Sequence, residues 1–392
     1  MKADNLISGL LRFPLLRLYD LLVSFRNFLY DIKLLKVHRL DKPVISIGNL
    51  AMGGAGKSPI TSALTGLLNK SGLKVAVLSR GYGRKEPETS RVTEPWGDWE
   101  LYGDEPVMMA RRHPYAKICV GPNRQTAARE ADAWNPDVFL LDDGFQHRKL
   151  HRDLDVVLID ITQPMPHRFS LSLFREHLPS LRRAHVVLLT RWDGVANLTP
   201  WKETIARYNP KVPVQPVIFK PGAVVFLDER ESEGPEFLKG KKVAAWSGIA
   251  RPEKFFKTLE GLGAELIHTL SLKDHEPLSL QKRKTFLQQC QLKNAALIIT
   301  TEKDAVKLEK SPDFGIITAF LSIEADWVGT QPLGGTLEQL IIHGKPLDSP
   351  LPNPRESIFH ETVSLPKGWA KALRASWLLA HKPFNFTLKD HQ

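Results

Sequence analysis

Cysteine and long apolar runs are both scarce in this sequence. Its 392 residues include two cysteines, Cys119 and Cys290, which are too few for a disulfide scaffold and too far apart for a paired metal site. Such low cysteine use indicates a reducing compartment such as the cytoplasm. No stretch approaches the roughly 20 apolar residues that cross a bilayer as a helix. Lys2, Asp4 and Arg12 interrupt any apolar core near the start, so no secretory signal is expected.

Acidic residues are in the minority. The chain has 54 Lys and Arg against 43 Asp and Glu, which gives a formal net charge of +11 at pH 7. This excess predicts an anionic partner, and charge alone leaves nucleotide, nucleic acid, acidic lipid and phosphorylated substrate open. With 42% hydrophobic and 25% charged residues, the chain has an ordinary globular composition and the length for two domains.

A glycine-rich stretch, Ala51-Met52-Gly53-Gly54-Ala55-Gly56-Lys57-Ser58, lies between the apolar run 44–47 and a predicted helix over 60–69. This context is typical of a phosphate-binding loop, whose amides and helix N-terminus face the phosphates. Lys57 is then expected to reach the β and γ phosphates, and the Ser58 hydroxyl to ligate Mg²⁺. Ala51 stands where the usual pattern has glycine, and the alternative is a Gly-Lys-Ser turn in a surface loop.

Polar residues also follow two later predicted strands. Strand 75–79 leads into Arg80-Gly81-Tyr82-Gly83-Arg84, and strand 138–141 leads into Asp142-Asp143-Gly144-Phe145-Gln146-His147. Open α/β sheets bind ligands at the carboxyl ends of their strands, although the arginines could also lie in a plain solvated turn. A carboxylate directly after a buried strand is what P-loop enzymes use to hold Mg²⁺. The two stretches therefore predict one nucleotide and magnesium site.

Strands alternate with helices from Val44 to Thr190, which predicts an α/β fold: a P-loop NTPase-type, mostly parallel sheet flanked by helices. A second, smaller α/β unit with its own strand–helix alternation follows. The predicted organisation is an N-terminal amphipathic helix (1–42), the P-loop core (43–207), a connecting segment (208–240), the smaller unit (241–330), and a C-terminal linker and tail (331–392).

The N-terminal segment 14–36 has an apolar stripe at helical spacing, with Leu18, Leu22 and Phe25 among its members. Basic residues surround the stripe, as in helices that lie in the interface of an anionic membrane. The alternative is a helix that packs this stripe on the protein's own core. A shorter stripe around Trp369 and Trp377 has the same two interpretations.

Three further motifs have ordinary alternatives. Asp104 and Glu105 open a predicted helix, where carboxylates often serve only as a cap. Asp274 and His275 share a loop and could be a solvated pair. The stretch 190–193, Thr-Arg-Trp-Asp, is similar to the base-reading element of guanine-nucleotide proteins, which leaves a nucleotide-switch or metallochaperone-type P-loop NTPase as an alternative function.

Taken together, these motifs resemble those of the tetraacyldisaccharide 4′-kinase family of Gram-negative lipid A biosynthesis. The resemblance covers about residues 14–320, with His177 standing where the family usually has proline. The motifs occur in the family's order: 48–50 (GNL), 53–59 (GGAGKSP), 79–84 (SRGYGR), 103–106 (GDEP), 142–147 (DDGFQH), 247–252 (SGIARP) and 301–304 (TEKD).

The resemblance implies an ATP- and Mg²⁺-dependent kinase that phosphorylates the 4′-hydroxyl of a tetraacylated glucosamine disaccharide 1-phosphate. It also implies a peripheral location at the cytoplasmic face of the inner membrane, reached through the N-terminal helix, and no nucleic-acid partner. Asp104 resembles the general base and His275 the residue that orients it. The remaining roles fall on the catalytic residues Lys57 and Asp143, the metal-side residues Ser58, Asp142, Glu105 and Gln146, and the phosphate or substrate contacts Arg80, Tyr82 and Arg124.

Overall fold

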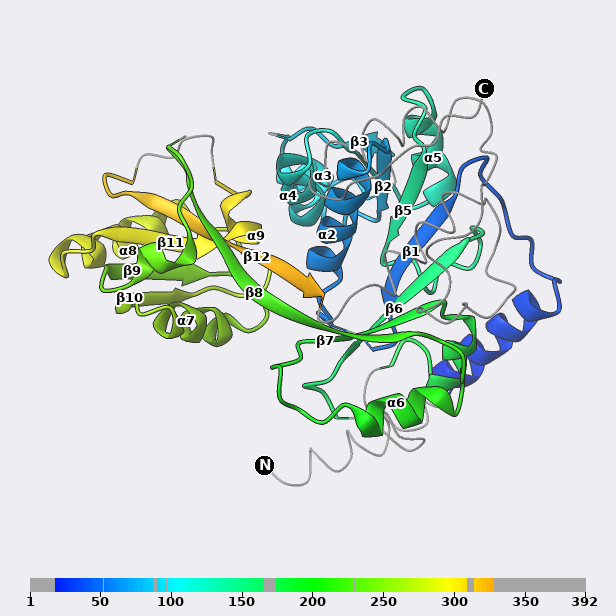
Figure 1. The fold of residues 1–392 in the computed structure, drawn as a ribbon. Helices are drawn as coiled ribbons and strands as arrows, with labels where there is room; N and C mark the ends of the chain where they lie inside the picture. The colour runs from blue at the N-terminus through cyan, green and yellow to red at the C-terminus, as the bar shows by residue number, and fades with distance from the viewer. Residues whose placement is uncertain are drawn as a thin grey trace, which may run out of the picture.

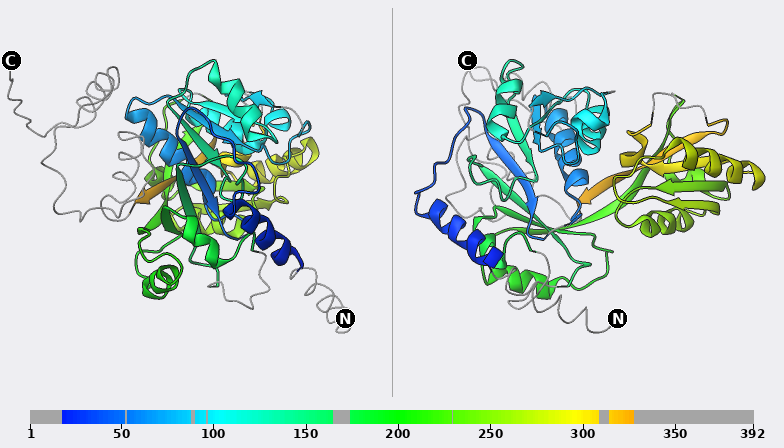
Figure 2. Two further views of the ribbon diagram at one scale, coloured as in Figure 1. Left: turned by 90° about the vertical axis from the view of Figure 1, so that its right-hand side faces the viewer. Right: turned by 180° about the vertical axis from the view of Figure 1, so that it is seen from behind.

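The structure, a computed structural model, describes residues 18–327 apart from 52, 88, 89, 96, 165–173, 229 and 309–313. Met52, the predicted tail 331–392 and the stripe around Trp369 therefore lie outside the described residues. Figure 1 shows two α/β lobes side by side, connected by the long strands β8 (Val214–Phe226) and β12 (Thr318–Trp327). The N-terminal helix lies at the far side of the larger lobe from the smaller one (Figure 2).

One twelve-stranded sheet runs through both lobes in the order β10-β9-β11-β12-β8-β7-β6-β1-β5-β2-β4-β3. Its pairs are parallel except β3–β4 and β8–β12, which confirms the predicted mostly parallel sheet. The other strands are β1 (Val44–Asn49), β2 (Val75–Ser79), β3 (Arg91–Val92), β4 (Lys117–Val120), β5 (Val138–Asp142), β6 (Leu154–Asp160), β7 (Val186–Thr190), β9 (Lys242–Ser247), β10 (Glu265–Ser271) and β11 (Leu297–Thr301).

Helices cover both faces of the sheet, as Figure 1 shows. The described residues 18–31 are helical. The other helices are α2 (Lys57–Lys70), α3 (Trp99–Tyr102), α4 (Asp104–Arg112), α5 (Arg124–Asp132), α6 (Thr199–Ala206), α7 (Pro252–Gly261), α8 (Leu280–Leu292), α9 (Glu302–Ala305), and the 3₁₀ helices η1 (Leu178–Arg183) and η2 (Pro235–Leu238).

The central strand β1 is buried along its whole length, as expected for a parallel strand covered on both faces. Ile45 and Ile47 pack with Ile60 and Leu64 of α2 in one core cluster, and this contact fixes the helix that follows the phosphate loop. Gly48 lies against the backbone of Phe145, where a Cβ atom would come within 2.5 Å of the Phe145 Cβ. The loop after β5 therefore packs directly on the end of β1.

The segment 208–240, interpreted from the sequence as a connection, contains the thirteen-residue strand β8. Pro216, Pro221 and Gly222 interrupt its pattern, and such residues argue against a strand. The partner strand β12 supplies the pairing that the sequence pattern does not show, from Ala319 opposite Phe226 to Trp327 opposite Val217. The two strands form the antiparallel ribbon that joins the lobes.

The described part of the N-terminal helix turns its polar side toward the protein. Asn27 Nδ2 donates to Glu176 Oε2 at 2.8 Å, and Arg148 Nη1 donates to the Asn27 carbonyl at 2.9 Å. Large apolar side chains of this segment are exposed, among them Leu18, Leu21, Leu22, Phe25 and Phe28. The interpretation that the stripe is buried in the protein's own core is therefore wrong for its described part. No helix within the described ranges is long and apolar enough to cross a membrane.

Candidate active site

The phosphate loop lies between the carboxyl end of β1 and the start of α2. Gly56 precedes the helix with a φ of 86°, and no side chain caps this N-terminus among the described residues. A Cβ atom on Gly56 would lie 2.3 Å from the Phe219 ring of β8, so the loop packs tightly there. Helix N-terminal amides left without a side-chain cap favour an anionic ligand.

Residues at the end of β7 and directly after it bind the backbone of this loop. Thr190 Oγ1 donates to the Ala55 carbonyl at 2.9 Å, and Arg191 Nη2 donates to the Gly54 carbonyl at 2.9 Å. Asp193 Oδ1 accepts hydrogen bonds from the backbone N–H groups of Val195 and Ala196. Thr190 and Arg191, which belong to the predicted base-reading element, therefore bind the backbone of the phosphate loop.

Lys57 is close to two acceptors at the ends of neighbouring strands. Its Nζ lies 3.3 Å from Asn49 Oδ1 and 3.4 Å from Asp143 Oδ1. Asp143 has a φ of 53°, a conformation that costs a non-glycine residue roughly 1 kcal/mol. Arg175 Nη1 lies 2.6 and 2.5 Å from the two Asp143 oxygens. Burial opposes ionisation of Asp143, but Lys57 and Arg175 hold the pKa of this carboxyl below its ordinary value.

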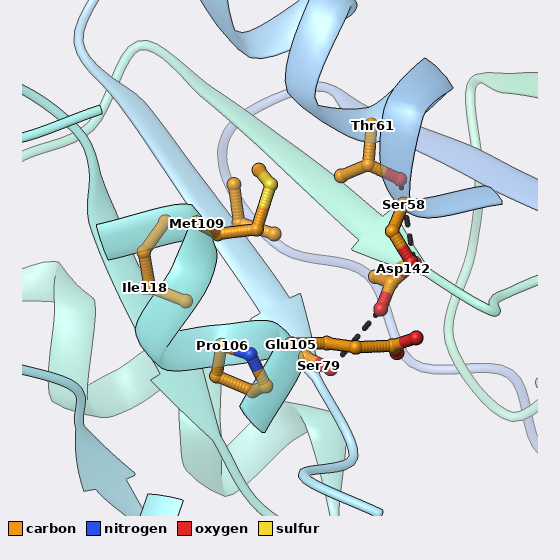
Figure 3. Close-up of a pocket in the computed structure, with 9 residues that line it drawn as sticks. Ser58, Thr61, Ser79, Glu105, Pro106, Met109, Ile118 and Asp142 are labelled. Atoms are coloured by element: carbon orange, nitrogen blue, oxygen red, sulfur yellow. Dashed lines mark hydrogen bonds between the residues drawn. The ribbon is translucent and has the colours of Figure 1, made fainter. Parts of the chain in front are cut away.

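Asp142 lies on the inner side of the same turn, beside a small cavity of about 10 Å³ that Ser58 and Glu105 also line. Figure 3 shows its carboxylate between the hydroxyl groups of Thr61 and Ser79, which donate to it at 3.3 and 3.1 Å. Burial, with help from the charges of Glu105 and Asp143, raises the pKa of Asp142 to about 6. The structure thus brings together three of the four predicted metal-side residues.

The fourth, Gln146, lies apart from this cavity and next to β1. Its Nε2 donates to the Asn49 carbonyl at 3.0 Å, while its Oε1 is buried without a hydrogen-bond partner among the described residues. Arg124 is buried, and its Nη1 donates to the Gly121 carbonyl at 2.7 Å. Burial lowers the pKa of Arg124 to about 10, although Asp142 and Asp143 oppose this shift. Arg124 therefore lies near the carboxylates but is bound to its own turn.

Asp104 and His275 meet across the two lobes. Asp104 begins α4, its side chain is 4% exposed, and its Oδ2 lies 2.9 Å from His275 Nδ1. Burial would raise the pKa of Asp104, but the His275 hydrogen bond and the charges of Lys303 and Lys307 together lower it. The same hydrogen bond raises the pKa of His275 against partial burial. The structure therefore pairs the predicted base with its predicted partner.

Arg80 and Tyr82 lie on the exposed side of this site. Arg80 is exposed at the end of β2, and Tyr82 is 74% exposed with its ring centroid 5.8 Å from that of His275. Gly81 and Gly103 have φ values of 65° and 94°, and a Cβ atom on Gly103 would lie 3.2 Å from the Gly81 Cα. This close approach of two loops places the Tyr82 ring beside His275.

Several residues of the site were not assigned a role from the sequence. Arg175 clamps Asp143, and Asn49 binds Lys57. Lys303 Nζ lies 3.3 Å from Glu105 Oε1 and 3.4 Å from His275 Nε2. Lys303 belongs to the 301–304 motif, so the sequence marked it as part of the family resemblance but did not predict its contacts with Glu105 and His275. Lys307 lies three residues after Asp304 and outside any motif, so nothing in the sequence pointed to its place in the site.

No group of three His, Cys, Asp or Glu side chains within the described ranges is arranged to hold a metal ion by itself. Zinc or calcium sites made by protein alone are usually built from such groups. Magnesium is bound differently, through one or two carboxylates together with phosphate oxygens and water. Ser58, Asp142 and Glu105 carry oxygen donors and lie together beside the phosphate loop, which fits this second arrangement.

Comparisons with known proteins point to one family. A family model described as LpxK, tetraacyldisaccharide-1-P 4′-kinase, matches residues 9–341. A tetraacyldisaccharide 4′-kinase of Anaeromyxobacter dehalogenans (strain 2CP-C) is 39% identical over 298 residues, which are 73% of this chain and 78% of the relative. One of Syntrophus aciditrophicus (strain SB) is 35% identical over 323 residues, 78% of this chain and 86% of the relative.

The comparison with solved structures gives the same result. The crystal structure of LpxK from Aquifex aeolicus in complex with ATP matches with a TM-score of 0.65 and 29% sequence identity. The match covers 85% of this chain and 99% of the other. The overall fold is therefore shared with a solved relative.

Proposed function

Because this chain belongs to the LpxK family of tetraacyldisaccharide-1-phosphate 4′-kinases, we propose that it transfers the γ-phosphoryl group of ATP to the 4′-hydroxyl of a tetraacylated glucosamine disaccharide 1-phosphate. The observation that best supports this proposal is the 2.9 Å contact between Asp104 and His275. It joins the two lobes next to Glu105, which lines the same cavity as Ser58 of the phosphate loop. A base and a phosphate cradle are what phosphoryl transfer to a hydroxyl requires.

Each residue then has a defined task. The uncapped N-terminus of α2 and Lys57 hold the β and γ phosphates, with the Lys57 ammonium leaving Asp143 for the nucleotide. Asp104 accepts the proton of the attacking sugar hydroxyl. His275 holds the Asp104 carboxylate in its orientation and, when protonated, offsets its charge. Such positioning, rather than covalent chemistry, supplies most of the rate acceleration in this reaction class.

Bound Mg²⁺ would reduce the negative charge on the transferred phosphoryl group. Ser58, Asp142 and Glu105 would hold the ion, since all three carry oxygen donors and line one cavity beside the phosphate loop. Gln146 lies apart from this cavity, so it is not assigned to the ion. Burial raises the pKa of Asp142 to about 6 in the free protein, and a bound cation would lower this pKa by favouring the ionised form.

The N-terminal helix is proposed to dock on an anionic lipid surface, at the cytoplasmic face of the inner membrane. The exposed apolar side chains of residues 18–28 support this, because such a patch is rarely left open on a monomeric protein. Lys33, Lys36 and Arg39 follow the helix and are exposed, and basic residues beside an apolar face favour anionic lipid. The tetraacylated acceptor, itself a membrane lipid, would then reach the site from the membrane surface.

The test is transfer of ³²P from γ-labelled ATP to a lipid extract that contains the acceptor, in detergent micelles with Mg²⁺. Labelled lipid that is absent with Lys57→Ala supports the kinase function. Hydrolysis of ATP or GTP without labelled lipid would instead favour the nucleotide-switch alternative. That alternative has little structural support, because Thr190 and Arg191 bind the backbone of the phosphate loop.

A further inference from the structure

Asp104 belongs to a closed ring of contacts. His275 Nδ1 lies 2.9 Å from Asp104 Oδ2, and the His275 backbone N–H donates to the Gly248 carbonyl at 2.9 Å. The Gly248 N–H donates to Asp304 Oδ2 at 2.8 Å. Asp304 Oδ1 accepts from Lys307 Nζ at 2.9 Å, and this ammonium lies 3.7 Å from Asp104 Oδ2. The ring therefore returns to the carboxylate from which it started.

The part of this ring that contains Lys307 is buried. The side chains of Lys307, Asp304 and Asp104 are 1%, 0% and 4% exposed. Charges removed from water in this way need partners, because an unpaired buried charge is costly. Asp304 is already held by Gly248 and by Thr301 Oγ1 at 2.7 Å. One ammonium group is therefore shared between two buried carboxylates.

The other cation near Asp104 is engaged differently. Lys303 Nζ lies 4.0 Å from Asp104 Oδ2 but 3.3 Å from Glu105 Oε1, and its side chain is 21% exposed. A nucleotide or metal ion that engages Glu105 would change the surroundings of Lys303. Lys307 faces away from solvent and keeps its place through Asp304. Of these two lysines, Lys307 is therefore the one whose ammonium group is held in a fixed position beside Asp104.

We propose that Lys307 is a positioning residue for Asp104: its ammonium group, anchored by Asp304, fixes the orientation in which Oδ2 meets His275. Its effect on rate rests on the proposed kinase function. The Asp304 carboxylate then positions both groups that contact Asp104. It binds the Lys307 ammonium directly, and it holds His275 through the Gly248 backbone. Lys307 acts through Asp104 and does not touch the substrate, since its side chain is buried.

The alternative is that Lys307 and Asp304 form an ion pair that only stabilises the second lobe. Lys307→Met alone leaves the Asp304 charge buried and unpaired, so it should also lower Tm. The double variant Asp304→Asn/Lys307→Met removes both charges, an exchange that often restores stability. We expect this variant to have a Tm close to that of the wild type and a kcat still reduced about 10-fold or more, with little change in the KM for ATP. Recovery of kcat together with Tm would overturn the proposal.

A double-mutant cycle tests whether Lys307 acts through Asp104. In an Asp104→Asn background, adding Lys307→Met should change the residual kcat less than about threefold, because the group it positions is gone. Independent, multiplicative losses would contradict the proposal. Lys282→Met is the matched control, since Lys282 also pairs with a carboxylate near His275, that of Glu276, but is exposed; it should retain wild-type kcat.

A spectroscopic measurement separates this proposal from the kinase function itself. In protein labelled with ¹⁵N-histidine, the imidazole signal of His275 can be assigned by its absence from His275→Asn. We expect the double variant Asp304→Asn/Lys307→Met to shift or broaden this signal, and Lys282→Met to leave it unchanged. An unchanged signal in the double variant overturns the positioning role. A changed signal with no lipid labelled by the wild type would instead support that role and count against the kinase function.

Discussion

The carboxylate of Asp104 and the imidazole of His275 lie 171 positions apart in the sequence and 2.9 Å apart in the structure. One begins α4 of the larger lobe, and the other lies in the loop between β10 and α8 of the smaller lobe. His275 adopts a φ of 64°, a conformation that persists only where the surroundings hold it. The contact therefore depends on how the lobes sit against each other.

Replacing Asp104 with Asn should lower kcat by about 10² to 10⁴, since the amide cannot accept the hydroxyl proton. ATP binding should remain, because the phosphate loop is untouched. Single-turnover transfer and binding of a fluorescent ATP analogue measure the two quantities separately. A kcat near that of the wild type would contradict the assignment of Asp104 as the base.

Replacing His275 with Asn should move the acid limb of the kcat/KM profile to higher pH. The His275 hydrogen bond is the first of the interactions that lower the pKa of Asp104 against burial. Without it, burial raises this pKa, so Asp104 becomes protonated, and inactive as a base, at a higher pH. His268→Asn, on β10 away from Asp104, is the control and should leave the profile in place. A limb that does not move in His275→Asn would show that the pair is not coupled.

Replacing Arg175 with Met should reduce kcat/KM for ATP by about tenfold or more. Arg175 and Lys57 lie on either side of Asp143, and loss of one cation frees this carboxylate to hold Lys57 more strongly. Lys57 would then be less available to the nucleotide. Arg182→Met is the matched control, because Arg182 is exposed and donates only to the Pro179 carbonyl among its described side-chain contacts. Equal kinetics in the two variants would remove Arg175 from the site.

Replacing Gly56 with Ala should abolish ATP binding and cost about 1–3 kcal/mol of unfolding free energy. The residue has a φ of 86°, and its new Cβ would lie 2.3 Å from the Phe219 ring. Gly261→Ala is the control, since Gly261 lies on α7 away from the loop and nothing lies within 4 Å of the Cβ position there. Titration calorimetry and chemical denaturation give the two quantities. Normal ATP binding by Gly56→Ala would mean that the loop has another conformation in solution.

Replacing both Leu21 and Phe25 with Glu should weaken binding to vesicles that contain anionic phospholipid by about tenfold or more. Both side chains are more than half exposed, so the change removes apolar area from the docking face and adds repulsion. Thermal stability should hardly change, because neither residue is buried. The control is Tyr115→Glu, an exposed aromatic residue outside the helix. Equal vesicle binding by all three proteins would contradict the docking proposal.

The sequence predicted the parts of the site that are local in the chain. A strand, glycines and Lys57-Ser58 specify a phosphate loop within a short stretch, and Asp142 follows a strand of four buried apolar residues. Strand β2 was predicted with its observed bounds, 75–79, because buried parallel strands have continuous apolar runs. β8 was missed because its prolines and glycine hide a strand whose pairing comes from β12, about 100 positions later.

Only the tertiary structure decided which side chains meet. Arg175 reaches Asp143, and Lys307 reaches Asp104, through contacts that no sequence spacing encodes, because they depend on the packing of whole lobes and loops. The orientation of the N-terminal helix was likewise decided by the tertiary structure. Its amphipathic pattern is the same whether the apolar side faces the protein or the solvent, and polar contacts such as Asn27 with Glu176 decide that it faces outward. The sequence determined the chemistry that is available, and the fold determined which groups can act on one another.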